Sequence, residues 1–201
     1  MLEAMCRGSD PGGIRSPFGR SGEWPPVPQA WKGETVSVIG GGQSAPEAQP
    51  KGKVIAVNNA YLLFDADLLY GCDYKWWNKY RPKFDGLKVT QDARAAKEFG
   101  LLRVPSENLP GLSLDPLRIH QGGNGGYQAI NLAVLLGAAE VRLYGFEMHG
   151  GHWHGEHVGL NNPEQGNFDR WVDSFRTIQS PVPIINCTPG SALDCFPMDN
   201  K

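Results

Sequence analysis

The chain has 201 residues, of which 40% are hydrophobic, and its formal net charge at pH 7 is −2. This length favours a single domain with a real core. The nearly balanced charge excludes a broad basic surface for general nucleic-acid binding. No apolar run approaches the roughly 20 residues that a membrane helix needs.

Residues 1–33 are rich in Gly, Pro, Ser and Arg and show no periodicity, so we expect a flexible N-terminal tail. Trp24 and Trp31 are candidates for anchoring its end onto the domain. Residues 34–201 are expected to form one domain. The N-terminus lacks the apolar centre of a secretory signal. The four cysteines form no Cys-x-x-Cys pair, which favours reduced thiols and a cytoplasmic protein.

Beyond the tail, short β-rich runs alternate with helical patterns. The predicted strands are 35–40, 53–59, 66–73, 87–90, 102–105, 118–121, 140–147 and 182–187. The predicted helices are 73–81, 92–99, 125–137 and 167–179. The helix at 125–137 is apolar nearly all round, which indicates burial, whereas 167–179 carries a one-sided apolar stripe. This alternation predicts an α/β fold with parallel strands joined by crossovers.

Small, polar or glycine-rich residues follow six of the predicted strands. In an open parallel sheet, ligands bind outside the carboxyl ends of the strands. The first such segment contains Gly40, Gly41, Gly42 and Ser44. Glycines there allow the backbone to approach a phosphate or a sugar closely, although a simple tight turn is an equally good interpretation of this motif alone.

Two further strand ends carry side chains that suit a ligand. Asn58 and Asn59 end the second strand, and each amide can both donate and accept hydrogen bonds, although a turn would also use them. Asp73 ends the third strand, next to aromatic residues that could wall a pocket or belong to the core.

The glycines before the apolar helix form another candidate site. Backbone N–H groups at the start of a helix attract anions, so Gly123, Asn124 and Gly125 are expected to orient a phosphate or an acceptor. We add Tyr127 and Glu147 to the expected nucleotide-binding residues.

Four of the five histidines lie in EMHGGHWHGEHVG, residues 147–159. They are His149, His152, His154 and His157. Imidazoles titrate near neutral pH, so acid–base catalysis or phosphate contact is our first hypothesis. A metal site on His152, His154 and His157 is the second, and a surface loop without function is the third.

The order of the motifs SVIGGGQSA, VIAVNNAYLL, ADLLYGCDYKWWNKY and GGYQAINLAVLLGAAEVRLYGFEM resembles the bacterial sialyltransferase family that includes bifunctional lipooligosaccharide enzymes. It also resembles the related domain of unknown function in flagellin-modification proteins and hydroxymethylpterin pyrophosphokinases. The resemblance spans about residues 35–193, and its best segment is 126–147, where Gly-Phe-Glu stands in place of the family's common Gly-Ile-Asp. The segments HWHGEH and INCTPGSALDCFP resemble uncharacterised bacteriophage proteins of the same superfamily.

This resemblance implies a Rossmann-like three-layer α/β/α domain of the glycosyltransferase-A type, with a mostly parallel sheet. In the sialyltransferases, the glycine-rich turn and an asparagine after the second strand hold the cytidine nucleotide. The corresponding residues here are Gly40, Gly42, Ser44 and Asn58 or Asn59. That family needs no metal. Its catalytic base is a histidine further along the chain, but this sequence has no histidine after His157, so that role is not transferred.

Three functions follow as hypotheses. The first is a glycosyltransferase-like enzyme that uses a nucleotide-sugar donor, without a certain cofactor. The second is a metal-dependent phosphoryl or pyrophosphoryl transferase, or a hydrolase, acting on a nucleotide. The third is a nucleotide-binding phage protein without catalysis. If the protein is phage-encoded, the expected location is the bacterial host cytoplasm, and a homo-oligomer is a further expectation.

Overall fold

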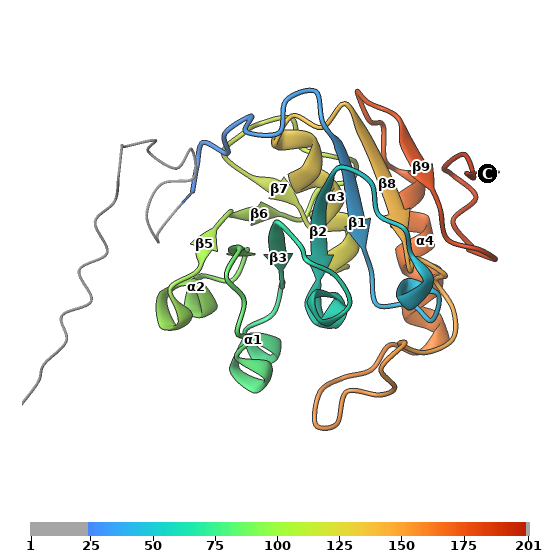
Figure 1. The fold of residues 1–201 in the computed structure, drawn as a ribbon, viewed down its shortest axis with the longest axis horizontal. Coiled ribbons are helices and arrows are strands. Elements are labelled where there is room, and N and C mark those ends of the chain that lie inside the picture. Colours follow the sequence, from blue (N-terminus) through green and yellow to red (C-terminus); the bar gives the residue numbers. More distant parts are fainter. Residues whose placement is uncertain (1–23, 200–201) are drawn as a thin grey trace, which may run out of the picture.

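The computed structural model describes residues 24–199, which form an α/β domain around one large parallel sheet (Figure 1). The sheet has seven strands in the order β5-β4-β3-β2-β1-β8-β9, and every neighbouring pair is parallel. Its strands are β1 (Thr35–Ile39), β2 (Lys53–Val57), β3 (Leu68–Tyr70), β4 (Leu87–Thr90), β5 (Leu102–Arg103), β8 (Glu140–Tyr144) and β9 (Ile184–Asn186). A separate parallel pair is formed by β6 (Ser106–Glu107) and β7 (Ile119–His120).

The helices lie close to their predicted positions. They are α1 (Tyr74–Tyr80), α2 (Ala93–Phe99), α3 (Gly125–Leu135) and α4 (Gln165–Arg176). The Rossmann-like α/β fold predicted from the sequence is therefore confirmed. Two short 3-10 helices, η1 (Ala45–Glu47) and η2 (Asn58–Leu62), were not predicted, because three to five residues are too few to show a period.

Side chains alternate between the two faces of the sheet and so build two cores. On one face, Val36 and Val38 of β1 pack with α3, α4 and the segment around Trp31. On the other face, Ile39 packs with η1, η2 and Tyr144, and a neighbouring cluster contains residues of α1 and α2. The strands therefore lie between two layers, as a parallel sheet with crossover helices requires.

The end of the expected tail packs on the domain. Trp24, Val27 and Trp31 are buried in the core beside α3. The Trp31 N–H donates to the carbonyl of Leu136, 2.8 Å away. The packed chain thus begins before the expected boundary at residue 34, because three apolar side chains cover one face of the domain. Residues 1–23 of the predicted tail lie outside the described residues.

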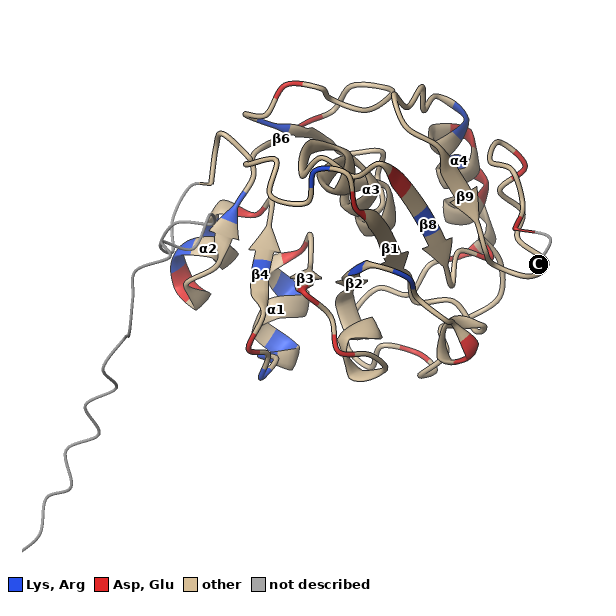
Figure 2. Ribbon diagram, turned by 45° about the horizontal axis from the view of Figure 1, so that its top comes forward, with Lys and Arg blue, Asp and Glu red and all other residues tan. Residues whose placement is uncertain are grey.

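The strand order reverses between β1 and β8, which lie side by side in the middle of the sheet. Such a switch point opens a crevice at the carboxyl ends of the strands, because the two chain connections leave in opposite directions. The loop after β8, orange in Figure 1, extends beyond this edge. Lys and Arg are interspersed with Asp and Glu along the described elements (Figure 2). Within residues 24–199, no helix has the length and apolar character to cross a membrane.

Candidate functional site

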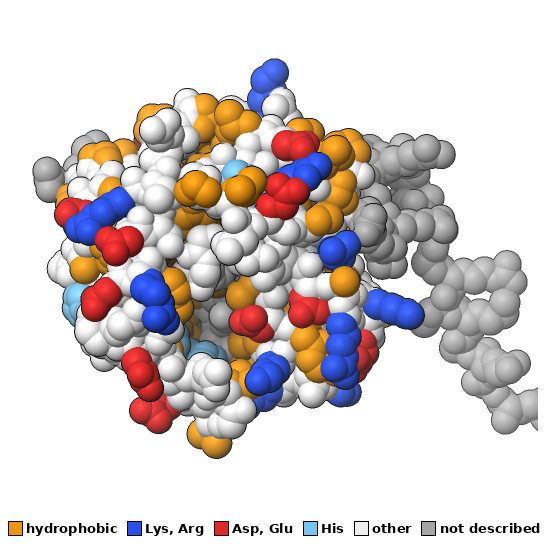
Figure 3. Space-filling view, turned by 180° about the vertical axis from the view of Figure 1, so that it is seen from behind, with side chains coloured by type: hydrophobic (Ala, Val, Ile, Leu, Met, Phe, Trp, Pro, Cys, Tyr) orange, Lys and Arg blue, Asp and Glu red, His pale blue; other side chains and the backbone are white. Residues whose placement is uncertain are grey.

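A large pocket, here called the main pocket, lies at the switch point. Its wall is formed by the ends of β1, β2, β3 and β8, the start of α3 and the loop 148–164, and its volume is about 1280 Å³. Histidine side chains lie at the edge of a hollow on the face shown in Figure 3. Because pockets of about 300–1,000 Å³ hold most small ligands, the main pocket has room for a nucleotide sugar and part of a second substrate.

The structure brings together the predicted site residues, apart from Ser44 and Tyr127. Those in the wall of the main pocket are Gly40, Gly41, Gly42, Asn58, Asn59, Asp73, Gly123, Asn124, Gly125, Glu147, His149, His152, His154 and His157. They meet because parallel strands deliver their carboxyl ends to one edge. The Tyr127 hydroxyl lies elsewhere, donating to the carbonyl of Gly111 at 2.6 Å, because the buried face of α3 carries its ring.

Glu147 holds the glycine turn in place. Its Oε1 accepts a hydrogen bond from the Ser44 backbone N–H at 2.7 Å, so Ser44 contributes through its backbone. Its Oε2 is buried and has no hydrogen-bond partner among the described residues. A Cβ at position 42 would clash with this oxygen and lie 2.7 Å from the Gly145 carbonyl oxygen, so only glycine fits there. Glu147 therefore positions the turn after β1 through its Oε1, and it also lies in the wall of the main pocket.

The two asparagines after β2 have different roles. Asn59 Oδ1 accepts a hydrogen bond from Trp76 Nε1 at 2.8 Å, so this amide holds α1 against η2. Asn58 adopts φ of 50°, a left-handed conformation that asparagine tolerates. The Oδ1 atom of Asn58 is buried without a hydrogen-bond partner among the described residues. Because an unpaired buried acceptor is costly, Asn58 is the better candidate to receive a hydrogen bond from a ligand.

Some of the backbone N–H groups at the start of α3 already donate hydrogen bonds to the N-cap residue, Asn124. Asn124 Oδ1 accepts hydrogen bonds from the N–H groups of Gly126, at 2.7 Å, and Tyr127, at 3.1 Å. An anion at this helix start is thus left with the amides of Gly123 and Gly125, which lie in the pocket wall.

Asp73 lies beside a half-buried thiol at the end of β3. The Sγ of Cys72 donates to Asp73 Oδ2 at 3.2 Å. Burial, followed by the nearby charge of Asp73, raises the pKa of Cys72 well above its ordinary value. The thiol therefore stays protonated at neutral pH. Cys72, Cys187 and Cys195 are free thiols, while Cys6 lies outside the described residues.

Three of the four clustered histidines contact one another. The ring centroids of His152 and His154 are 5.1 Å apart, those of His152 and His157 5.0 Å, and those of His154 and His157 4.6 Å. His149 is separate from this triad, and its Nε2 lies 3.0 Å from the carbonyl oxygen of Gly190. The glycines of the loop allow it to fold back on itself, which brings histidines at different spacings to one point.

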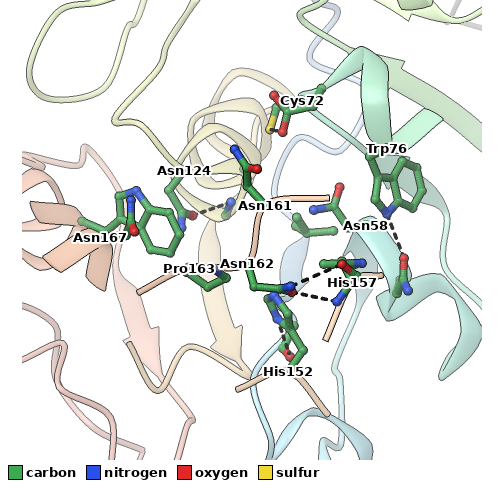
Figure 4. Close-up of a pocket in the computed structure, with 18 of the residues that line it drawn as sticks. Asn58, Cys72, Trp76, Asn124, His152, His157, Asn161, Asn162, Pro163 and Asn167 are labelled. Carbon is green, nitrogen blue, oxygen red and sulfur yellow. Dashed lines mark hydrogen bonds between the residues drawn. The ribbon is translucent and has the colours of Figure 1, made fainter. Parts of the chain in front are cut away.

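Contacts at the Nδ1 atoms of His152 and His157 define the orientation of these two rings. His152 Nδ1 lies 3.3 Å from the carbonyl oxygen of Gly41. A carbonyl only accepts, so Nδ1 carries the proton and the neutral ring has its lone pair on Nε2. His157 Nδ1 lies 2.5 Å from the Tyr80 hydroxyl, which fixes that ring from the side of α1. Figure 4 shows both rings near Asn162, which is joined to the His157 backbone by two hydrogen bonds.

The three imidazoles are neutral at pH 7. Burial lowers the pKa of His152 and is the largest cause for the other two rings as well. Repulsion from His152 lowers the pKa of His154 further. For His157, burial followed by repulsion from His152, His154 and Lys79 lowers the pKa to about 4. Neutral imidazoles can accept a proton at one nitrogen and donate from the other.

Sequence reasoning missed a second set of amides in the wall. Asn161, Asn162 and Asn167 come from the segment that ends the histidine loop and begins α4 (Figure 4). Asn162 Oδ1 accepts a hydrogen bond from the His157 N–H at 2.7 Å, which closes the loop. The run LNNPE before the predicted fourth helix was a usable signal, since it resembles the paired asparagines after β2. Trp171, which lies within the predicted helix 167–179, is also in the wall.

Within residues 24–199, no group of three or more His, Cys, Asp or Glu side chains is placed to hold a metal ion. Comparison with known proteins finds no matching family model, no matching curated protein and no matching solved structure.

Proposed function

We propose that this protein transfers a glycosyl group from a nucleotide-sugar donor to a hydroxyl group of an acceptor. The observation that carries the proposal is the orientation of His152 in a large pocket at the switch point. Its Nδ1 faces the Gly41 carbonyl, so Nε2 is the free base of a neutral ring.

The donor nucleotide is assigned to the part of the pocket nearest β1 and β2. The glycine turn lets the backbone approach it closely, and the Asn58 Oδ1, which lacks a partner within the described chain, accepts a hydrogen bond from it. The amides of Gly123 and Gly125 face the phosphates.

In the proposed reaction, the acceptor hydroxyl attacks the anomeric carbon of the donor sugar. Its proton passes to His152 Nε2, and the bond between the anomeric carbon and the phosphate oxygen breaks. The leaving phosphate takes the bonding electron pair. His157 donates a hydrogen bond to that oxygen from Nε2 when the Tyr80 O–H donates to its Nδ1.

The test begins with a thermal-shift screen over nucleotides, nucleotide sugars and divalent ions. We expect one class of nucleotide sugar to raise the melting temperature, because a ligand that binds only the folded state stabilises it. Release of free nucleotide in the presence of candidate acceptors then measures turnover.

The decisive variant carries His152→Ala and His154→Ala together. We expect it to fold and to bind the donor, but to lose turnover by at least about 100-fold, since general bases commonly contribute that much. His120→Gln is the matched control, because His120 lies outside the main pocket and its Nδ1 faces backbone carbonyls. Full turnover in the double variant contradicts the proposal.

Elemental analysis, together with the binding and turnover assays, separates the two other hypotheses. About one metal ion per purified chain, lost in the double variant, supports metal-dependent phosphoryl transfer. Tight nucleotide binding without product after a long incubation supports a binding protein without catalysis.

A further inference from the structure

A second pocket, here called the side pocket, adjoins the main pocket. Its volume is about 510 Å³, and its wall comes from α4, the loop between β6 and β7, and the residues before α3. Gly123, Asn167 and Trp171 lie in the walls of both pockets. A molecule in the side pocket would therefore meet a ligand in the main pocket at Trp171.

Arg170 is the charged residue in the wall of the side pocket. Its guanidinium has no hydrogen-bond or ion-pair partner among residues 24–199. Other arginines of the domain differ in this respect: Arg94, Arg118, Arg142 and Arg176 all pair with carboxylates. A free guanidinium at the wall of a concave site matches a carboxylate or a phosphate, to which its fork donates two parallel hydrogen bonds.

The rest of the wall suits a sugar ring. The Trp171 indole is half-buried and is held edge-on by Phe168, with ring centroids 5.4 Å apart. The apolar C–H face of a sugar packs on such a surface without ordering a flexible side chain. Asn108 and Asn167 place amides beside it, and each amide can donate to and accept from hydroxyl groups.

The geometry points to the side pocket as the binding site for the acceptor, and to the acceptor as a carbohydrate that carries a carboxylate or phosphate group. The sugar ring lies on Trp171, its anionic group meets Arg170, and its reacting hydroxyl extends past Gly123 into the main pocket. The role as acceptor site rests on the proposed function, whereas the binding of an anionic sugar does not.

The test measures binding without any nucleotide donor, so its outcome is independent of the transferase proposal. Ligand-observed NMR titrations use three probes: glucuronate, glucose 6-phosphate and neutral methyl glucoside. We expect the wild-type protein to bind at least one anionic probe more tightly than methyl glucoside. A preference for glucuronate assigns a carboxylate to the acceptor, and a preference for glucose 6-phosphate assigns a phosphate.

Arg170→Gln removes the charge and the guanidinium fork while retaining a shorter polar side chain. We expect it to weaken binding of the preferred anionic probe by about tenfold or more, the usual size of a charge-assisted hydrogen bond, and to leave methyl glucoside unchanged. Arg176→Gln makes the same charge change on the same helix, outside the side pocket, and should leave all three probes unchanged.

Trp171→Phe provides a second measurement, with circular dichroism to verify the fold. We expect it to weaken binding of the neutral and anionic sugars alike, because the stacking surface shrinks. The inference is overturned if the wild-type protein binds methyl glucoside as tightly as both anionic probes, or if Arg170→Gln has the same affinity as the wild type.

Discussion

The turn 40–44 and the loop 148–164 lie side by side in the wall of the main pocket, joined by a β-bridge between Gly42 and His152, and they are held differently. The turn is fixed through its backbone: Gly42 N–H donates to the Gly145 carbonyl at 3.0 Å, and Ser44 N–H donates to Glu147. The loop is held at separate points, among them the contacts of His152 with Gly41 and of His157 with Tyr80. Backbone hydrogen bonds thus fix the turn, which we propose lies against the nucleotide, whereas a few side-chain contacts orient the imidazoles.

The largest loss of stability is expected from a substitution in the turn 40–44, where an added Cβ has no free space. Gly42→Ala would place a Cβ against Glu147 Oε2 and 2.7 Å from the Gly145 carbonyl. We expect it to lower the free energy of unfolding by about 3 kcal/mol, since neither neighbour can move without breaking the hydrogen bonds of the turn. Urea unfolding measures this.

Gly151→Ala is the matched control in the loop. A Cβ there meets no atom within 4 Å, and its φ lies outside the left-handed region. We expect its free energy of unfolding to stay within about 0.5 kcal/mol of the wild type. Equal losses in the two variants would show that the turn and the loop do not differ in the way described.

A smaller effect on stability is expected from a change in pH, and it arises from the histidines of the loop 148–164. The folded-state pKa values of His152, His154 and His157 lie below the ordinary value of 6.5. Below pH 6.5 the unfolded chain therefore binds protons that the folded chain does not. Stability contributed by these neutral rings is present above pH 6.5 and is lost as the pH falls toward about 4, the pKa of His157.

Urea unfolding at pH 7 and pH 5 tests this sign. The wild type should lose more stability between the two pH values than a variant carrying His154→Asn and His157→Gln. Carboxylates titrate in both proteins and cancel in the comparison. Parallel pH profiles would mean that the histidines titrate normally in the folded protein.

The smallest effect is expected from one anchor of the loop. Tyr80→Phe removes the hydroxyl that bonds to His157 Nδ1 but retains the ring packed near Trp76. We expect a loss of about 1 kcal/mol in the free energy of unfolding, the usual value of one such bond. Nucleotide release, where it is measurable, should slow by less than about tenfold.

Tyr61→Phe is the control for this change, because the Tyr61 hydroxyl has no hydrogen-bond partner among the described residues and its ring lies in the same aromatic cluster. If both variants have the stability of the wild type, the bond from Tyr80 does not hold the loop.

Much of the fold followed from local patterns. The apolar run at 125–137 predicted a buried helix, and α3 is buried nearly all round because the sheet lies on one side and further chain covers the other. The polar residues at strand ends predicted a shared edge, because parallel strands must deliver their ends together. These patterns repeat over many residues, so a single sequence carries enough signal.

The roles of individual residues in the site were harder to predict from the sequence. Asn58 and Asn59 are indistinguishable in the sequence, but one holds Trp76 and the other has an unpaired acceptor. Glu147 was predicted to contact a ligand, and the structure adds that its Oε1 holds the Ser44 N–H. Hydrogen-bond partners 17 and 103 residues away decide such roles, and no local period encodes them.

The sequence by itself determined the alternation of strands and helices, the edge at which polar residues gather, and the concentration of histidines after β8. Only the tertiary structure decided which histidines meet, which nitrogen of His152 is free, and that Trp171 and Arg170 line a second pocket. The reason is physical: burial patterns are properties of neighbouring residues, whereas a site is built from the ends of segments that meet only when the sheet has formed.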